Sequence, residues 1–433
     1  MKKILMIVFH YPPVQGSSGV HRTLNFSRYL PEHGWQPIVL TVTAKAYPAI
    51  EPSQYSRIPS NIPVERALAL DSGRHLAVRG AYPRCLALPD RWISWWPDGV
   101  MKGLRLIRRH RPQVIWSTYP IATAHLIGLS LHRMSGVPWV ADFRDPMTEK
   151  DPVTGEEFPS DPAIRRVNGW IERPAIRHCS RAVFTTPGTA DMYAKRFRDV
   201  PQTRWAVIPN GYDEESFNAA QSSIGGKAPG SGKIVLLHSG LLYPHARNPK
   251  CFFQAVAQLR ASGAVSPATL RIILRGSGHE NIYRSYVKEL SIEDLVSLEG
   301  TVPYEEALGE MLGADGLLIF QASNCNWQIP AKVYEYLRAR RPILAFTDPN
   351  GDTASLLRSE GINTILPIDS SHEIACGLRH FLQSVKDGSA PVPNESRVSR
   401  YSRRLRTGEL ATLLNSLAEA VPQQWQLVSR RRA

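Results

Sequence analysis

The chain has 433 residues, 43% hydrophobic and 21% charged, and this composition excludes fibrous, collagen-like and disordered proteins. Its 52 Lys and Arg against 38 Asp and Glu give a formal net charge of +14. Such an excess favours an anionic partner, namely nucleic acid, anionic lipid or a phosphorylated substrate, although a merely soluble Arg-rich surface explains it equally well. Five scattered cysteines without a Cys-x-x-Cys pair indicate neither a disulfide framework nor a zinc site and favour a reducing cytoplasm.

The first half of the chain alternates apolar runs with helical periodicity. The run at 3–9 holds six consecutive apolar residues, Ile4 to Phe9, which are too few for the core of a signal peptide and predict a buried strand. A helix over 20–33 and a strand over 37–42 complete a unit of parallel α/β type. The further elements expected here are strands at 113–117, 138–141, 182–185 and 205–208, and helices at 122–133 and 163–178.

Residues 218–232 are small, polar and rich in glycine, which predicts a linker between a first domain, residues 1–217, and a second, residues 233–390. In the second domain we expect strands at 234–238, 270–274, 296–299, 316–320 and 342–346, and helices at 249–262, 280–290, 304–313 and 331–338. Residues 391–433 predict an amphipathic helix and a basic tail, with one stripe formed by Leu405, Leu410, Leu413, Leu414 and Leu417.

The loop after the first strand combines glycines with cations. His10 begins it, Gly16 and Gly19 allow close approach of a ligand to the backbone, and Arg22 lies one turn into the following helix. The loop lacks the spacing of a dinucleotide-binding or Walker A motif. An anion site and a simple tight turn both fit these residues.

Two carboxylates flank an arginine after the strand at 138–141. Asp142, Arg144 and Asp145 are placed to bind hydroxyls or to orient a base, and a structural ion-pair network is the competing interpretation. His125, in the helix before that strand, is expected in the core.

The second domain carries glycines and cations in the loops that follow its strands. Gly240 and Arg247 lie between a strand and a helix, where an arginine can clamp a diphosphate. Arg275, Gly276 and Gly278 follow the next strand and suggest close approach of the backbone to a ligand.

Lys332 and Glu335 open the helix after a later apolar strand. There, backbone N–H groups, the helix dipole and the ammonium converge on a point suited to phosphate oxygens, and Glu335 could accept two ribose hydroxyls. A surface ion pair between the two side chains is the alternative. No Gly-x-Ser-x-Gly, His-Glu-x-x-His or Asp-x-Asp occurs, so no serine hydrolase site and no metal site is predicted.

Four segments in this order resemble the family 4 glycosyltransferases of the GT-B fold. They are the loop from Phe9 to Arg22, Pro138 to Pro146, Ile208 to Asp213, and Ile329 to Leu337. The resemblance implies two Rossmann-like parallel-sheet domains facing a cleft, with a last helix that returns to the first domain. It further implies retaining, metal-independent transfer of a hexosyl or N-acetylhexosaminyl group from a nucleotide-diphosphate sugar, with no other cofactor.

The resemblance also implies roles for single residues. The catalytic group would be Arg247, Lys332 and Asp142, with the two cations neutralising the diphosphate. The donor would be bound by Gly16, Gly19, Gly240, Arg275, Gly276, Gly278, Val302 and Glu335, and the acceptor by His10, Arg22, Arg144 and Asp145. Family members commonly have two glutamates separated by seven residues; with Glu335 as the second, the first position is Trp327 in this chain, so the loop at 323–328 must contact the sugar in another way.

Related sequences with an Asp-Phe-Arg-Asp segment resemble enzymes that build surface polysaccharides on lipid-linked carriers. We therefore expect a glycan or lipid-pyrophosphate-linked acceptor, no nucleic acid partner, and a cytoplasmic protein at the inner face of the plasma membrane. Tryptophans at 92, 95 and 96 precede a basic helix and predict contact with an anionic membrane, against a buried tryptophan cluster as the alternative. The alternative function is an inactive GT-B protein that binds polyanions or serves as a scaffold.

Overall fold

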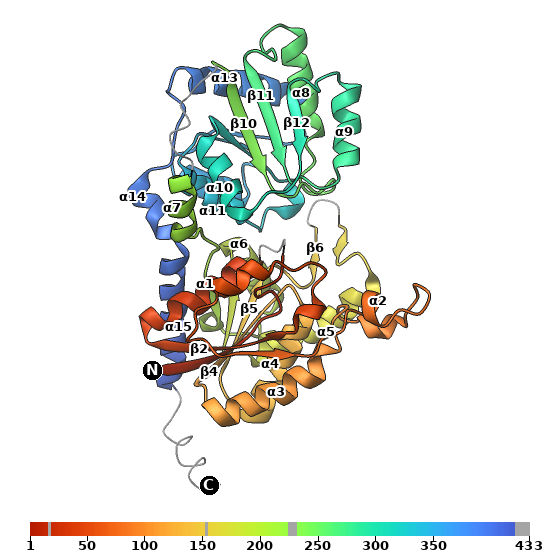
Figure 1. Cartoon of the computed structure of the whole chain (residues 1–433), viewed down its shortest axis with the longest axis vertical. Helices are drawn as coiled ribbons and strands as arrows, with labels where there is room; N and C mark the ends of the chain where they lie inside the picture. The colour runs from red at the N-terminus through yellow and green to blue at the C-terminus, as the bar shows by residue number, and fades with distance from the viewer. Residues whose placement is uncertain (16–18, 152–154, 224–231, 421–433) are drawn as a thin grey trace. The chain divides into compact units, whose positions relative to one another are not determined.

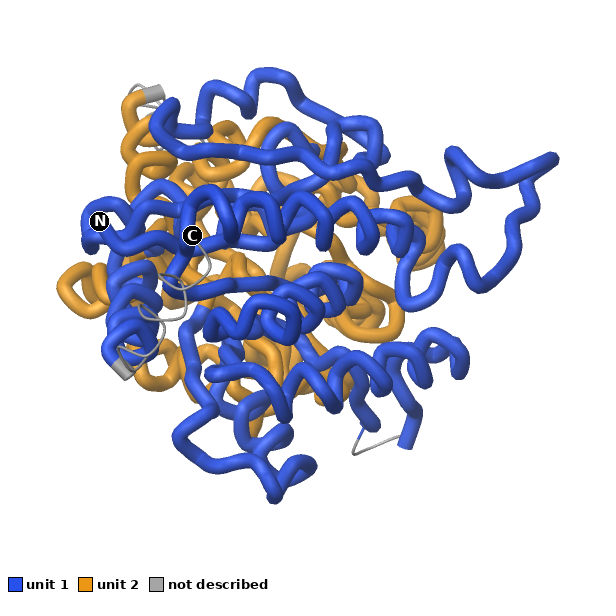
Figure 2. The backbone as a smooth tube through the Cα atoms, turned by 90° about the horizontal axis from the view of Figure 1, so that it is seen from below, with its two compact units in different colours: residues 1–209, 403–433 blue, residues 210–402 orange. Residues whose placement is uncertain are grey.

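The computed structural model describes residues 1–15, 19–151, 155–223 and 232–420. The chain divides into two compact units, one of residues 1–209 and 403–433 (unit 1) and one of residues 210–402 (unit 2) (Figure 2). The predicted linker at 218–232 is wrong in its first part, because residues 218–223 belong to helix α7 (Glu214–Ser223), which buries Phe217 and Ala220. Residues 224–231 lie outside the described residues.

Unit 1 contains a seven-stranded sheet in the order β3-β2-β1-β4-β5-β8-β9, with every neighbouring pair parallel. The strand order reverses between β1 and β4, and ligands of such sheets bind beyond the carboxyl ends of the strands at that point. The strands are β1 (Lys2–Ile7), β2 (Trp35–Val42), β3 (Val64–Ala67), β4 (Val114–Thr118), β5 (Trp139–Arg144), β8 (Arg181–Phe184) and β9 (Trp205–Val207).

The two faces of this sheet bury different helices, because successive side chains of a strand point to opposite sides. Leu5 and Ile7 of β1 belong to the core beneath α3 (Trp95–His110), α4 (Ala122–Ser135) and α5 (Pro162–His178). Ile4 and Met6 belong to the core beneath α1 (Gly19–Tyr29) and α15 (Arg403–Ala420) (Figure 1).

Helix α15 belongs to unit 1 although it follows all of unit 2 in sequence. Leu410 and Leu414 are buried in the same core as Leu24 and Phe26 of α1. The amide oxygen of Asn415 accepts hydrogen bonds from Lys2 Nζ at 2.9 Å and from Trp35 Nε1 at 3.1 Å. Leu405 was predicted on the apolar stripe, but it is 53% exposed because it lies on the other side of the helix.

Unit 2 contains a six-stranded parallel sheet in the order β12-β11-β10-β13-β14-β15, which reverses between β10 and β13. Its strands are β10 (Ile234–Ser239), β11 (Leu270–Arg275), β12 (Val296–Glu299), β13 (Gly316–Phe320), β14 (Ile343–Phe346) and β15 (Ile365–Leu366). One face packs on α8 (Lys250–Ala261), α9 (Glu280–Glu289) and α13 (Ser371–Lys386), and the other on α7, α10 (Tyr304–Gly313), α11 (Lys332–Ala339) and α12 (Asp352–Ser359).

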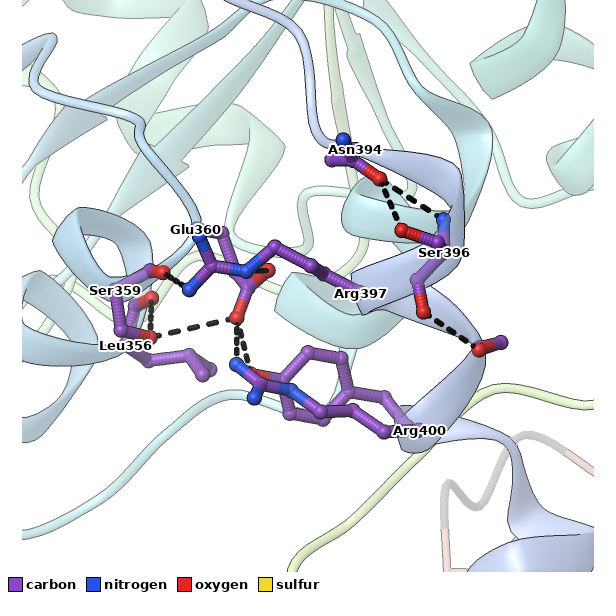
Figure 3. Close-up of polar contacts among 9 residues, drawn as sticks. Leu356, Ser359, Glu360, Asn394, Ser396, Arg397 and Arg400 are labelled. Atoms are coloured by element: carbon purple, nitrogen blue, oxygen red, sulfur yellow. Dashed lines mark hydrogen bonds and ion pairs between the residues drawn. The ribbon is translucent and has the colours of Figure 1, made fainter.

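A buried carboxylate joins α12 to the end of unit 2 (Figure 3). Glu360 Oε1 accepts hydrogen bonds from Arg400 Nη2 and, at 2.6 Å, from the Tyr401 hydroxyl, while Oε2 lies 3.5 Å from Arg397 Nε. The side chain of Glu360 is fully buried, whereas the two arginines are half exposed. This cluster anchors α14 (Glu395–Val398) and the segment after it.

Candidate functional site

In unit 2, the ammonium of Lys332 lies at the carboxyl end of β10. Lys332 begins α11, and its Nζ is 3.0 Å from His238 Nε2 on β10. Gly240 follows β10 with φ +103°, and a Cβ there would lie 3.1 Å from Lys332 Nζ. Gly240 therefore serves two needs, a left-handed backbone and room for the ammonium.

His238 positions this ammonium. The ring is fully buried, with Nδ1 2.8 Å from the Leu318 carbonyl oxygen. Burial and the charge of Lys332 hold the pKa of His238 well below its ordinary value, so the ring is neutral. In the tautomer with the proton on Nδ1, Nδ1 donates to the Leu318 carbonyl and Nε2, which also lies 3.0 Å from the Gly240 carbonyl oxygen, accepts a hydrogen bond from Lys332. The sequence indicated no role for His238, because it is the last but one residue of an apolar strand.

Arg247 places a second positive charge near Lys332. Its guanidinium lies 5.3 Å from the ring centroid of Tyr243, Nη1 donates to the Leu241 carbonyl at 3.4 Å, and the buried Nε has no hydrogen-bond partner within the described part of the chain. Burial and the charge of Arg247 hold the pKa of Lys332 well below its ordinary value. Among the described residues no ion pair to a carboxylate joins either cation, so the site favours an anion.

Glu335 is buried one turn after Lys332 and accepts a hydrogen bond from the Tyr304 hydroxyl at 2.8 Å. It is therefore not half of a surface ion pair. Val302 is half-buried in the loop between β12 and α10. The predicted roles of both residues in donor binding stay predictions.

Arg275 does not present a free guanidinium. Nε bonds Glu310 at 2.8 Å, Nη2 bonds Glu299 at 2.8 Å and also Glu310, and Nη1 donates to the Gly300 carbonyl at 2.9 Å. These bonds fasten β11 to β12 and α10. The geometry gives Arg275 a structural role in place of the predicted contact with the donor.

The two glycines after Arg275 have left-handed backbones, with φ +58° at Gly276 and φ +62° at Gly278. A Cβ at Gly276 would lie 3.2 Å from Thr301 Cγ2, and one at Gly278 would lie 2.9 Å from Leu241 Cδ2. Ser277 between them is buried, and its hydroxyl has no partner in the described structure. The turn needs both glycines whether or not a ligand approaches it.

The loop at 323–328 is shaped by Gln321, whose amide donates to the Cys325 carbonyl at 2.6 Å and to the Gln328 carbonyl at 2.8 Å. Asn324 and Asn326 each donate from their amide nitrogen, to the His245 carbonyl and to Asp348. Their amide oxygens are buried and have no hydrogen-bond partner in the described parts of the chain. The loop therefore provides two amide oxygens as hydrogen-bond acceptors in place of the carboxylate of a glutamate.

In unit 1, Arg22 and Asp142 form a buried ion pair with two hydrogen bonds, from Nε at 2.9 Å and from Nη2 at 2.8 Å. Thr118 also donates to Asp142 at 2.9 Å, and Arg22 donates to the Pro209 carbonyl at 3.2 Å. The exposed fraction is 2% for the Arg22 side chain and 0% for Asp142. The alternative interpretation, a structural ion pair, describes these two residues better than the predicted contacts with acceptor and reacting atoms.

His10, Gly19 and Arg144 come together at the carboxyl ends of β1 and β5. A Cβ at Gly19 would lie 2.9 Å from Arg144 Nη1 and 3.0 Å from His10 Nδ1. Burial and the charge of Arg144 lower the pKa of His10 to about 3. Arg144 has φ +57° in a bulge of β5, and its Nε is buried without a partner in the described residues. Arg144 is thus the predicted acceptor residue whose charge is least satisfied.

Asp145 is half-buried next to Arg144. Burial, together with Asp145 and Asp151, raises the pKa of Glu149 to about 7. Gly16 lies outside the described residues. His125 is buried as expected, with Nδ1 2.8 Å from the Ser117 hydroxyl.

Comparison with known proteins finds a family model that matches part of the chain. Residues 18–211 match the model of the glycosyl transferase 4-like domain. Residues 18–211 are thus similar to a glycosyl transferase 4-like domain. None of the curated proteins matches the chain significantly in sequence.

The whole chain is similar in structure to sucrose-phosphate synthase from Thermosynechococcus elongatus, with a TM-score of 0.63, 13% identity and 100% of both chains covered. It is also similar to Anabaena HepE in complex with UDP and glucose, with a TM-score of 0.56, 15% identity and 99% of each chain covered. WaaG, a glycosyltransferase involved in lipopolysaccharide biosynthesis, gives a TM-score of 0.56 and 12% identity over 96% of this chain and 97% of that one. The chain has the GT-B fold that its sequence predicts.

In unit 1, most of the predicted interfacial tryptophans are not at the surface. Trp95 is fully buried, and Trp92 packs on Phe9 at 4.6 Å between ring centroids and donates to the Ala46 carbonyl at 3.0 Å. Lys102 is held by Glu65 and Asp98. The alternative of a buried cluster is correct here, and only Trp96, 40% exposed, remains at the surface.

The described helices of both units are all too short or too polar to cross a membrane. Among the described residues, His, Cys, Asp and Glu side chains do not gather in any group of three or more that could hold a metal ion.

Proposed function

We propose that the chain is a retaining, metal-independent glycosyltransferase that moves a hexosyl or N-acetylhexosaminyl group from a nucleotide-diphosphate sugar to a glycan acceptor. The observation that carries the proposal is the pair of cations in unit 2, Arg247 and Lys332, which lack a paired carboxylate among the described residues. A diphosphate supplies the negative charge that this pair needs. The glycosyl transferase 4-like domain supports the reaction class, and HepE, solved with UDP and glucose, supports the class of donor.

Lys332 and Arg247 would act on the leaving group. His238 takes one of the three N–H bonds of Lys332 and leaves two for phosphate oxygens. As the bond between sugar and phosphate breaks, negative charge grows on the diphosphate, so fixed cations stabilise the transition state more than the bound donor. An oxygen of the departing diphosphate takes the proton of the acceptor hydroxyl on the face that the leaving group vacates. Glu335 would accept hydrogen bonds from the ribose.

The acceptor in this proposal is a glycan carried on a lipid pyrophosphate, used in surface-polysaccharide synthesis at the cytoplasmic face of the plasma membrane. Unit 1 supports it by charge, because it carries 34 Lys and Arg against 18 Asp and Glu. Arg144, with its unpartnered buried Nε, is the residue of unit 1 best placed to meet an anionic acceptor. The structural likeness to WaaG supports the same class of pathway.

The test is turnover with a panel of nucleotide sugars, measured as donor hydrolysis and as transfer to lipid-linked acceptors. Arg247→Ala and Lys332→Ala should each lower kcat/KM by about 100-fold or more, the usual effect of removing one charge-stabilising group. Lys288→Ala, which removes an exposed cation from the last turn of α9, should leave kcat/KM unchanged. Unchanged turnover in both site variants would refute the assignment. Absence of nucleotide binding, together with salt-sensitive binding of nucleic acid, would favour the scaffold alternative.

A further inference from the structure

Helix α5 of unit 1 presents an exposed row of cations around a tryptophan. Arg166, Trp170, Arg173 and Arg177 recur at spacings of four, three and four residues, which places them on one side of a helix, and all four are exposed. Trp170 is 68% exposed, more than any other tryptophan of the described residues. An exposed indole between arginines costs hydration free energy unless something covers it.

A groove of about 1050 Å³ borders this row. Its apolar lining comes from Leu126 and Leu129 of α4, Ile171 of α5 and Phe197, and Trp96 lines it from α3. The groove therefore joins apolar surface to the arginines of α5, whose Arg166, Trp170 and Arg173 also line it.

A buried carboxylate, Glu172, is among the residues that line the groove. Glu172 accepts a hydrogen bond from the Thr148 hydroxyl at 2.7 Å and bonds both the Tyr193 hydroxyl and Arg196. The guanidinium of Arg196 covers the ring of Phe197 at 4.7 Å. These bonds connect Thr148, Glu172 and Arg196, which all line the groove.

Positive charge in the groove exceeds the negative charge that can neutralise it. Glu157 pairs with Arg165, Glu172 pairs with Arg196, and Asp199 pairs with Arg177 of the α5 row. Three exposed arginines in the lining are left without an ion pair among the described residues: Arg133, Arg166 and Arg173. Next to Arg133, Met134 is 63% exposed.

We propose that the α5 row and its groove, which we call the α5 face, bind a bilayer that contains anionic phospholipids. Guanidinium groups pair with lipid phosphates, and indole side chains prefer the interface between headgroups and acyl chains. The aliphatic lining, with Leu126 and Leu129, and the exposed Met134 suit acyl chains, which nucleic acid lacks, whereas Trp170 alone could also stack on a base. The inference builds on the proposed function, because a lipid-linked acceptor requires the enzyme at a membrane. It moves the predicted contact from the tryptophans at 92–96 to α4 and α5.

The test is co-sedimentation of the full chain with vesicles of phosphatidylcholine alone or with about 30% phosphatidylglycerol. We expect binding only to the anionic vesicles. This binding should be lost in about 0.5 M NaCl, because salt at that concentration shortens the electrostatic screening length to about 4 Å. The double variant Arg166→Ala/Arg173→Ala should lower the affinity for anionic vesicles about 30-fold, because each arginine contributes a factor of about five. Trp170→Ala should weaken it about tenfold.

The matched control is Arg105→Ala/Arg108→Ala, which removes the same charge from exposed positions of α3. This variant should bind anionic vesicles nearly as well as the parent. Equal sedimentation of the α5 double variant and the parent would overturn the proposal, and so would equal binding to neutral vesicles or salt-sensitive binding of an RNA oligonucleotide with none to vesicles. Melting temperatures check that each variant is folded.

Donor hydrolysis without vesicles separates this inference from the proposed function. If the chain binds anionic vesicles through α5 but hydrolyses no nucleotide sugar, the proposed membrane contact is supported and the proposed activity is refuted. If the chain hydrolyses the donor but does not sediment with vesicles, the proposed activity is supported and the proposed membrane contact through the α5 face is refuted.

Discussion

The two units share a doubly wound topology and differ in how they treat positive charge. Unit 1 has a net charge of +16, yet the arginine at the centre of its sheet edge, Arg22, is neutralised by Asp142. Unit 2 has 18 Lys and Arg against 20 Asp and Glu, a net charge of −2, yet Lys332 and Arg247 lack a paired carboxylate in its described residues. Net charge thus does not locate an anion site, and the local pairing of each cation does.

The largest effect is expected from a substitution that breaks the Arg22–Asp142 ion pair of unit 1. Asp142→Ala leaves the Arg22 guanidinium buried without its partner, and we expect a loss of about 3–5 kcal/mol of stability, read from the denaturant or thermal unfolding of unit 1. Arg22→Met/Asp142→Leu, which removes both charges, should recover most of this loss. A double variant as unstable as the sum of the single ones would show that the two side chains do not act as a pair.

The opposite response is expected in unit 2. Lys332→Met removes a buried cation that has no paired carboxylate, so the melting temperature should stay unchanged or rise. The affinity for a nucleoside diphosphate should fall by about 100-fold, equivalent to about 2.7 kcal/mol. Thermal unfolding and calorimetry with UDP check both halves of the prediction. A fall in melting temperature with unchanged UDP affinity would make Lys332 a structural residue like Arg22.

Glu360→Gln tests a carboxylate of unit 2 that is paired. Glutamine keeps the shape and loses the charge that Arg397 and Arg400 share, and both arginines are half exposed, so we expect a loss of about 1–2 kcal/mol after allowance for solvent screening. Chemical denaturation gives this number, and nucleotide binding should stay intact. The matched control is Glu395→Gln, because that carboxylate pairs with Arg340 at the exposed surface. Equal effects of both changes would contradict the special role of burial.

The smallest expected effect is on pH dependence. The pKa of Lys332 is lowered in the free protein, and a bound diphosphate favours the charged ammonium, so binding raises that pKa and takes up a proton. UDP affinity should therefore fall as pH rises through the pKa of the free protein, by about tenfold per unit at most. Calorimetry in buffers of different ionisation enthalpy measures the uptake. Lys332→Met should abolish it, and uptake that persists in this variant would assign the proton to another group.

Elements and site residues could be predicted from the sequence where the residue pattern of a single segment is sufficient. Buried parallel strands are continuous apolar runs, so β1, β10 and β13 could be placed from sequence. Lys332 could be found because a cation at the start of a helix after such a strand is a local pattern. The short edge strand β3 lacks an apolar run, since its four residues include Glu65 and Arg66, and it was missed.

The other features depend on pairs that are far apart in sequence. From the sequence alone, Asp142 suggests a catalytic or ligand-binding carboxylate. Its partner Arg22, which neutralises it, lies 120 positions away and is not indicated by any local pattern. His238 and Lys332 are separated by 94 positions, and nothing in an apolar strand indicates which histidine meets an ammonium. Arg275 has the same limitation, because Glu299 and Glu310 come from two later elements. Spacing within a motif therefore finds a cation but not whether that cation is already neutralised.

The return of the chain to unit 1 has a consequence for the order of folding during synthesis. Residues 210–402 are contiguous, so the core of unit 2 needs no segment that is synthesised after residue 402. The core that holds Leu24 and Phe26 must wait for Leu410 and Leu414, and until then the nascent protein exposes that apolar face to solvent. A chain truncated after Ser402 would keep this face open for good, which makes it a substrate for chaperones or an aggregation hazard.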